Sequence, residues 1–297
     1  MASHRLALPA LILASIISGT GSTAVKLALR YFDPFTLLFL RLILASSLLL
    51  LSSFLIHQFS LVFSKRILLA SILFTNNLIF FTLGMNLTTA ISAGILVSLV
   101  PINLAILTHW RRKSEPVSTN QWAGLCLGLI GAFIIIIRSF NPDGHVINSV
   151  GTPLGNLFIL VGVSSYSLYL YLNQPLTRRF SPFLLTTYNS SIAALVTLPL
   201  FLWANSRHTT FTQILHLPAV SILIFIVLIL SIGMYLLYQW GIKHTSSLTA
   251  GTTIYLSPLV SAAVAIPILG ERLTPHLLFG GSAILIGVYL ANRKPKA

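Results

Sequence analysis

Several polar side chains of this sequence fall inside long apolar stretches, where hydrogen-bonding groups are costly. An amide that faced lipid would leave its hydrogen bonds unmet, so we expect the neighbouring Asn76 and Asn77 to face the protein interior. Two tyrosine pairs are each spaced by three residues, which places both members on one helix face. For the asparagines an interhelical hydrogen bond, and for Tyr238 a place in the interfacial aromatic belt, are equally good interpretations. The predicted binding residues are Lys26, Asn76, Asn77, Phe81, Ser98, Tyr166, Tyr169, Tyr235, Tyr238 and Tyr255.

Two basic residues, Lys26 and Arg41, also fall inside apolar stretches. Charges within a membrane often mark functional sites, and Lys26 would then attract the carboxylate or phosphate of a substrate. The alternative is that the long side chains extend toward the outer headgroups. For Arg41 this snorkelling interpretation is favoured, and for Lys26 the two interpretations are balanced.

The four carboxylates of the chain all fall in predicted loops or at helix ends, at Asp33, Glu115, Asp143 and Glu271. Carriers that select organic cations or use protons usually hold a carboxylate within the membrane, so the sequence predicts facilitated diffusion or exchange instead. An enzyme would need clustered His, Asp, Glu or Cys facing a cavity, and these residues are scarce here and fall mostly outside the predicted spans. We therefore expect a non-enzyme without a cofactor or a metal site. No charge ring or carbonyl filter motif of an ion channel is present in the sequence either.

The elements that must position these residues are membrane helices. Of 297 residues, 56% are hydrophobic and only 7% are charged, which is too few to solvate a globule of this size. Spanning a bilayer takes about 20 apolar residues. The sequence predicts an all-α membrane protein with ten transmembrane helices, at 7–29, 35–56, 66–85, 88–110, 119–139, 153–175, 183–204, 218–241, 246–269 and 275–292.

The net charge of +14 is explained by membrane orientation rather than by nucleic acid. With a cytoplasmic N-terminus, twelve basic residues fall on the inner side, and only Arg30, Arg138, Arg207 and Arg272 fall on the outer side. This bias predicts that both termini are cytoplasmic. The inner residues are Arg5, Lys65, Arg66, Arg111, Arg112, Lys113, Arg178, Arg179, Lys243, Arg293, Lys294 and Lys296.

An internal repeat divides the chain into halves. Residues 84–101 recur as 241–258 with six of eighteen positions identical, including the terminal prolines Pro101 and Pro258. With five spans in each half, the second half enters the membrane from the opposite side, so the sequence predicts inverted repeats at 1–140 and 153–297. Interrupted helices in corresponding positions are typical of carriers, where such prolines kink a helix or allow gating near the midplane.

The chain resembles the EamA-like family of the drug/metabolite transporter superfamily over essentially its whole length. One departure is Ser18-Gly19, where the family has a tryptophan before the glycine, so one expected cavity aromatic is missing. The residues that carry the resemblance are Gly21-Ser22, Val25 to Ala28, Asp33-Pro34-Phe35, Leu40-Arg41, Ala93-Gly94 to Pro101, Glu115, Gln121 to Gly124, and Leu269 to Thr274.

The resemblance implies a secondary transporter of a cytoplasmic (inner or plasma) membrane that works by alternating access, as a uniporter or exchanger and mainly outward. It also implies a central cavity lined by spans one, three, four, six, eight and nine. Aromatic and amide walls favour a small metabolite such as an amino acid. The alternative is a phosphate-bearing metabolite exchanger, or a lipid or multidrug transporter. The expected partners are a small-molecule substrate and lipid, with monomer and homodimer both open.

Overall fold

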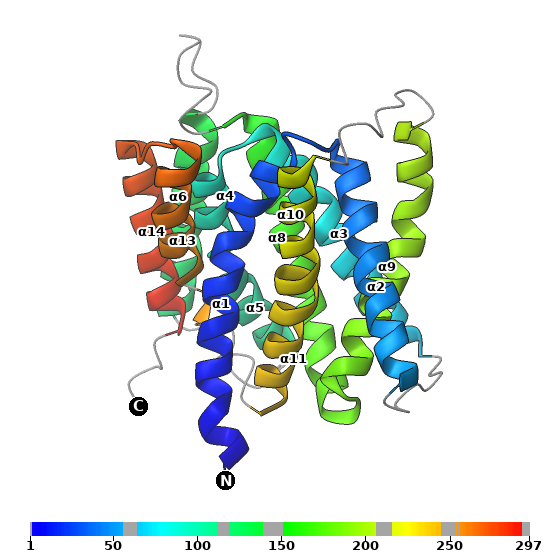
Figure 1. Ribbon diagram of the computed structural model, residues 1–297. Helices are drawn as coiled ribbons and strands as arrows, with labels where there is room; N and C mark the ends of the chain where they lie inside the picture. The colour runs from blue at the N-terminus through cyan, green and yellow to red at the C-terminus, as the bar shows by residue number, and fades with distance from the viewer. Residues whose placement is uncertain are drawn as a thin grey trace.

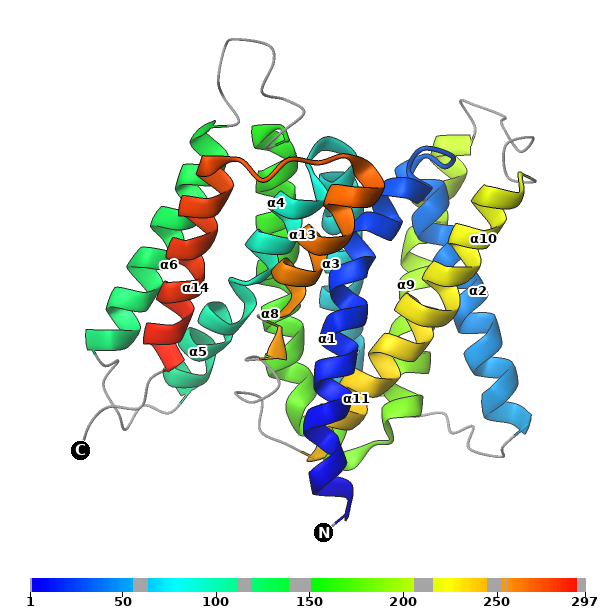
Figure 2. The same cartoon turned by 60° about the vertical axis from the view of Figure 1, so that its left-hand side comes forward.

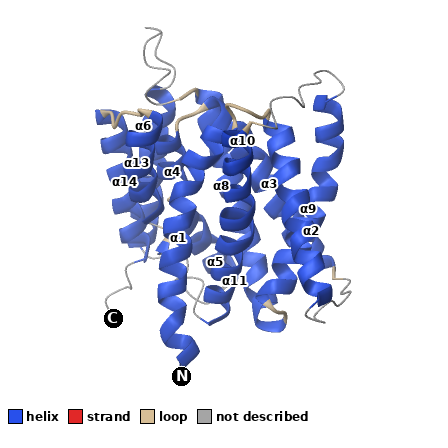
Figure 3. Cartoon of the chain, viewed as in Figure 1, coloured by secondary structure: helices blue, strands red, loops and turns tan. Residues whose placement is uncertain are grey.

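The structure is a computed structural model that describes residues 2–55, 64–111, 119–138, 151–205, 216–244, 253–254 and 256–292. Helices account for nearly all of these residues and no strand occurs among them, which confirms the all-α class (Figure 3). The helices are α1 (Ala2–Ala28), α2 (Pro34–Leu55), α3 (Lys65–Leu87), α4 (Ala90–Val97), α5 (Val100–Arg111), α6 (Thr119–Arg138), α8 (Pro153–Arg179), α9 (Pro182–Asn205), α10 (Leu217–Phe225), η2 (Ile226–Gly233), α11 (Met234–His244), α13 (Leu256–Leu269) and α14 (Pro275–Asn292).

In the described part of the chain, six helices are long and apolar enough to cross a membrane. They are Leu6–Ala28, Pro34–Leu55, Lys65–Leu87, Pro153–Arg179, Pro182–Asn205 and Leu217–His244. Shorter apolar helices cover Ala90–Leu104, Trp122–Ile137, Leu256–Leu269 and Pro275–Gly287. The N-terminal end of α1 and the C-terminal end of α14 lie at the same end of the bundle (Figures 1 and 2).

The helices pack in pairs. α6 lies along α14 at one edge of the bundle and α2 along α9 at the other (Figure 2). Between these edges α1 contacts α11 and α13, while α3 and α5 contact α8. Glycines permit the closest approaches, because a Cβ at Gly131 of α6 would lie 2.5 Å from the carbonyl oxygen of Gly280 in α14. Small residues at such contacts are the usual way in which membrane helices pack closely.

The observed ends of α2, α3, α6, α9 and α14 lie within two residues of the predicted ones. The span predicted at 88–110 is instead two helices, because α4 ends at Val97 and α5 begins at Val100 after a turn at Ser98 and Leu99. Pro101 is the second residue of α5, where its missing N–H is not needed. Of the span predicted at 246–269, the helix is described from Leu256 onward.

A second irregularity lies in the stretch Leu217–His244. Its middle part, η2, has π-helical hydrogen bonding, whereas α10 and α11 on either side are regular. Such wider turns are rare and often occur at functional sites, because they reorient the side chains that follow. Here the side chains concerned belong to Leu230 and Ser231 within η2 and to Tyr235 just after it.

Candidate functional site

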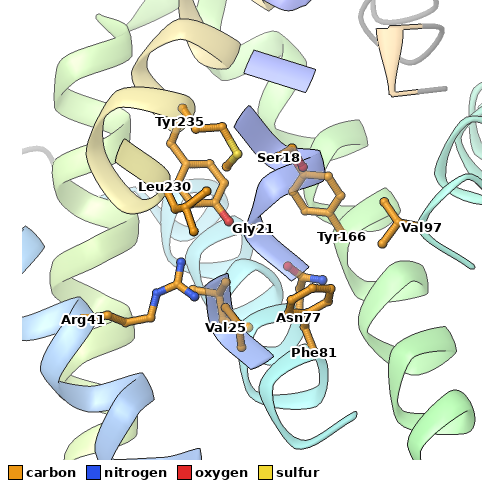
Figure 4. Close-up of a pocket in the computed structure, with 12 residues that line it drawn as sticks. Ser18, Gly21, Val25, Arg41, Asn77, Phe81, Val97, Tyr166, Leu230 and Tyr235 are labelled. Carbon is orange, nitrogen blue, oxygen red and sulfur yellow. The ribbon is translucent and has the colours of Figure 1, made fainter. Parts of the chain in front are cut away.

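A cavity of about 100 Å³ lies inside the bundle between α1, α2, α3, α8 and the α10–η2–α11 stretch. Its walls are mostly apolar with a few polar groups, which is the usual composition of a small-molecule site. Figure 4 shows Arg41 and Tyr235 on one side of this space, and Tyr166, Asn77 and Phe81 on the other. The lining residues are Ser18, Gly21, Val25, Arg41, Asn77, Leu78, Phe81, Val97, Tyr166, Leu230, Met234 and Tyr235.

Arg41 is the cation of this lining. Its side chain is only 4% exposed, and its Nε donates a hydrogen bond to Ser231 Oγ at 3.1 Å. The snorkelling interpretation of Arg41 is therefore wrong. The side chain lies on the face of α2 that packs against η2, where a serine hydroxyl and a cavity are available, so it turns inward.

Four of the predicted binding residues line the cavity: Asn77, Phe81, Tyr166 and Tyr235. Asn77 also donates from Nδ2 to the Gly162 carbonyl oxygen at 2.9 Å, which joins α3 to α8 beside the cavity. The interhelical hydrogen bond and the cavity contact, which were alternatives in the sequence, thus coexist at this residue.

Tyr169 lies behind the cavity in a polar network. Its ring stacks on that of Tyr166 with centroids 5.7 Å apart, and its hydroxyl accepts hydrogen bonds from Asn189 Nδ2 and Gln239 Nε2, both at 2.9 Å. Phe74 packs against Tyr235 with ring centroids 4.9 Å apart. This network supports the tyrosines that reach the cavity, and Tyr169 itself is not among the lining residues.

The remaining predicted residues lie elsewhere. Asn76 donates to Ser165 Oγ at 2.7 Å, again between α3 and α8. Tyr238 is buried, as is Ser98 in the turn between α4 and α5. Pro258 lies in the first turn of α13, and Tyr255 lies outside the described residues.

Lys26 lies in the last turn of α1 and is not among the residues that line the cavity. Its Nζ donates to the carbonyl oxygens of Met85 at 2.9 Å and Thr88 at 2.5 Å, where α3 ends. Carbonyls at a helix C-terminus lack intrahelical donors and carry partial negative charge. The ammonium group therefore connects α1 through two hydrogen bonds to the end of α3 and the link to α4.

Sequence reasoning did not include Arg41 or the apolar lining residues Val25, Leu230 and Met234 in the binding set. For Arg41 a signal existed, because a charge inside an apolar span is unusual. For the apolar residues no signal was present, because lipid-facing and cavity-facing aliphatic side chains look alike in a sequence.

These features define a helical membrane protein with a cavity between its helices whose lining is typical of a small-molecule site. The EamA-like transporter family matches residues 5–137 and again residues 153–293. An uncharacterised transporter of Archaeoglobus fulgidus is 24% identical over 275 residues, covering 91% of each chain. The uncharacterised transporter sll0355 of Synechocystis sp. is 25% identical over 238 residues, covering 72% of this chain and 67% of the relative.

A protein of known crystal structure is similar in fold, with a TM-score of 0.62 and 15% identity over 98% of this chain and 96% of the other. At that identity the likeness concerns the fold alone. The two family matches together cover most of the sequence, so the chain belongs to the EamA-like transporter family. It is therefore a membrane transporter.

Proposed function

We propose that this chain carries small metabolites such as amino acids across a cytoplasmic (inner or plasma) membrane by alternating access, mainly outward. The observation that carries the proposal is the cavity between α1, α2, α3, α8 and the α10–η2–α11 stretch, which combines aliphatic and aromatic walls with one guanidinium. Such walls suit a small solute that has an apolar body and a polar end.

The proposal includes a layout of ten spans in two inverted halves, 1–140 and 153–297, with both termini in the cytoplasm. The helix packing supports this layout, because α2 packs on α9, α4 on α13 and α6 on α14, and each pair joins corresponding positions of the two halves. The contact between α1 and α11 likewise has its counterpart between α8 and α3. Both patterns are expected when a two-fold axis in the membrane plane relates the halves.

The positions of the acidic residues favour uniport or exchange over transport driven by protons. Asp33 and Glu271, the two carboxylates within the described residues, lie at helix ends and accept backbone hydrogen bonds there. Neither lines the cavity. A carrier driven by protons would need a group that binds and releases a proton at or near the solute site.

The test is a counterflow assay with the purified full chain in proteoliposomes, using amino acids, nucleotides and quaternary ammonium ions, each with and without a pH gradient. Flux of amino acids that is insensitive to the gradient is expected, whereas nucleotide flux would favour the phosphate-bearing alternative. Ser18→Leu, which fills the cavity, should stop the flux, and Ser164→Leu, on the exposed face of α8, should not. Absence of protein-dependent flux for every solute, or full activity of Ser18→Leu, would refute the proposal.

A further inference from the structure

Arg41 carries hydrogen-bond donors that the described protein does not use. A guanidinium has five N–H groups, and only Nε has a partner, the Ser231 hydroxyl. In the part of the chain that the structure describes, no carboxylate pairs with Arg41, although its side chain is only 4% exposed. A buried cation without a counter-charge is expensive, and among the described residues none supplies that charge, so the cavity beside Arg41 is the place where a bound solute could supply it.

The surroundings of Arg41 aim the unused donors at the cavity. Ser231 fixes the Nε edge of the guanidinium, so that the terminal nitrogens extend into the space shown in Figure 4. Tyr235 lines the same cavity as Arg41, and Figure 4 shows the two side chains on the same side of this space. The planar fork of an arginine matches the two oxygens of a carboxylate, and a phenol O–H can donate to the same group.

The charge of the residues that line the cavity favours a carboxylate over a phosphate. Arg41 is the single cation among the lining residues, and Lys26 is already occupied by two backbone carbonyls. One guanidinium neutralises one carboxylate, whereas a phosphate monoester carries about −1.5 to −2 charge at pH 7 and would leave excess charge in a low-dielectric space.

We propose that Arg41, assisted by Tyr235, binds the carboxylate of the transported solute, whose apolar body packs on Val25, Leu78 and Leu230. This inference rests on the proposed transport function and specifies its substrate class: small carboxylates with an aliphatic body, amino acids included. Arg41 is thus the specificity-determining residue of the cavity, while Ser231 is a positioning residue that holds the guanidinium in place.

The experiment uses three matched probes: L-leucine, L-leucinamide, which lacks the carboxylate, and 4-methylpentanoate, which lacks the amine. Binding to the detergent-purified full chain is measured by ligand-dependent shift of the unfolding midpoint, and transport is measured by counterflow. Wild-type protein should bind the two carboxylates at least about tenfold more tightly than the amide, as the loss of one charge-assisted interaction predicts. This comparison requires no substitution.

The variants assign the preference to one residue. Arg41→Gln should abolish the discrimination between acid and amide, Arg41→Lys should retain part of it, and Tyr235→Phe should weaken it several-fold. Arg66→Gln, which removes an equal charge from the exposed start of α3, should bind as the wild type does.

Equal binding of acid and amide by the wild type would overturn the inference, as would discrimination that survives in Arg41→Gln. Binding of neither carboxylate by a chain that transports other solutes would also overturn it, and would leave the transport function standing. Carboxylate binding without any flux would refute transport and leave the role of Arg41 standing.

Discussion

Replacement of Glu271 tests how the first turn of α4 is held. Glu271 follows α13, yet its Oε1 accepts from the backbone N–H of Ala90 at 2.7 Å and its Oε2 from that of Ile91 at 2.9 Å. Thr89 Oγ1 accepts from the N–H of Ser92 at 3.2 Å. The N–H groups at a helix start have no intrahelical acceptor, and here a carboxylate from 180 residues away satisfies two of them.

The expected effect follows from these contacts. Ala90 is 0% and Ile91 1% exposed, while the two bonds to Glu271 are part-buried, so water replaces a lost acceptor only in part. Glu271→Gln keeps one acceptor but loses the charge at the helix terminus and one charge-assisted bond, which predicts a loss of about 1–3 kcal/mol. Glu271→Ala leaves two buried donors without partners and predicts a loss of about 2–5 kcal/mol.

The assay is the thermal unfolding midpoint of the purified full chain. Asp33→Asn is the matched control, because Asp33 Oδ1 caps α2 by accepting from Phe35 N–H at 3.0 Å and Thr36 N–H at 3.1 Å. Asparagine caps a helix as well as aspartate does, so this variant should stay within about 0.5 kcal/mol of wild type. The reasoning is refuted if Glu271→Gln has the same unfolding midpoint as the wild type, or if Glu271→Gln and Asp33→Asn lower the midpoint equally.

Three further outcomes are expected. Tyr169→Phe strips two amide donors of their acceptor and should lower stability by about 1–3 kcal/mol in the same thermal assay, while the exposed Tyr289→Phe should be neutral; equal midpoints would contradict the network. Gly131→Leu places side-chain atoms against a carbonyl of α14 and should cost about 1–3 kcal/mol or more, so a wild-type midpoint would count against the close α6–α14 contact. Accessibility reporters at positions 1 and 150 should label from opposite membrane faces, and labelling from the same face would rule out the inverted layout.

Helix positions were largely predictable because a single quantity, the length of an apolar stretch, decides them. The start of α2 is an example: Asp33 caps it and Pro34 occupies its first turn, both visible in the sequence. The π-helical turn of η2 was not predictable, because its apolar residues fit a regular helix equally well.

The direction of a side chain inside the bundle was harder to predict, because partners distant in sequence decide it. Tyr166 and Tyr169 share a face of α8, yet one lines the cavity while the other is held by Asn189 and Gln239. For Arg41 the deciding partner is Ser231, 190 residues away. Spacing along one helix reveals which residues lie together, and it does not reveal what faces them.

Lys26 and Arg41 both place a positive charge within a span, where an unpaired charge is costly. The two residues find different partners, and this difference affects the expected transport mode. Lys26 is satisfied by backbone carbonyls whatever the cavity contains, whereas the terminal donors of Arg41 face the cavity. With a bound carboxylate the pair is neutral, so closing the cavity around it removes no net charge from water. Closing an empty cavity would bury the guanidinium without its counter-charge. The carrier loaded with a monocarboxylate should therefore change its side of access more readily than the empty one, which favours exchange over uniport. We expect counterflow of 4-methylpentanoate, which has no ammonium group to restore a net charge, to exceed its net efflux. Equal rates would show that another group, or water, compensates Arg41 in the empty state.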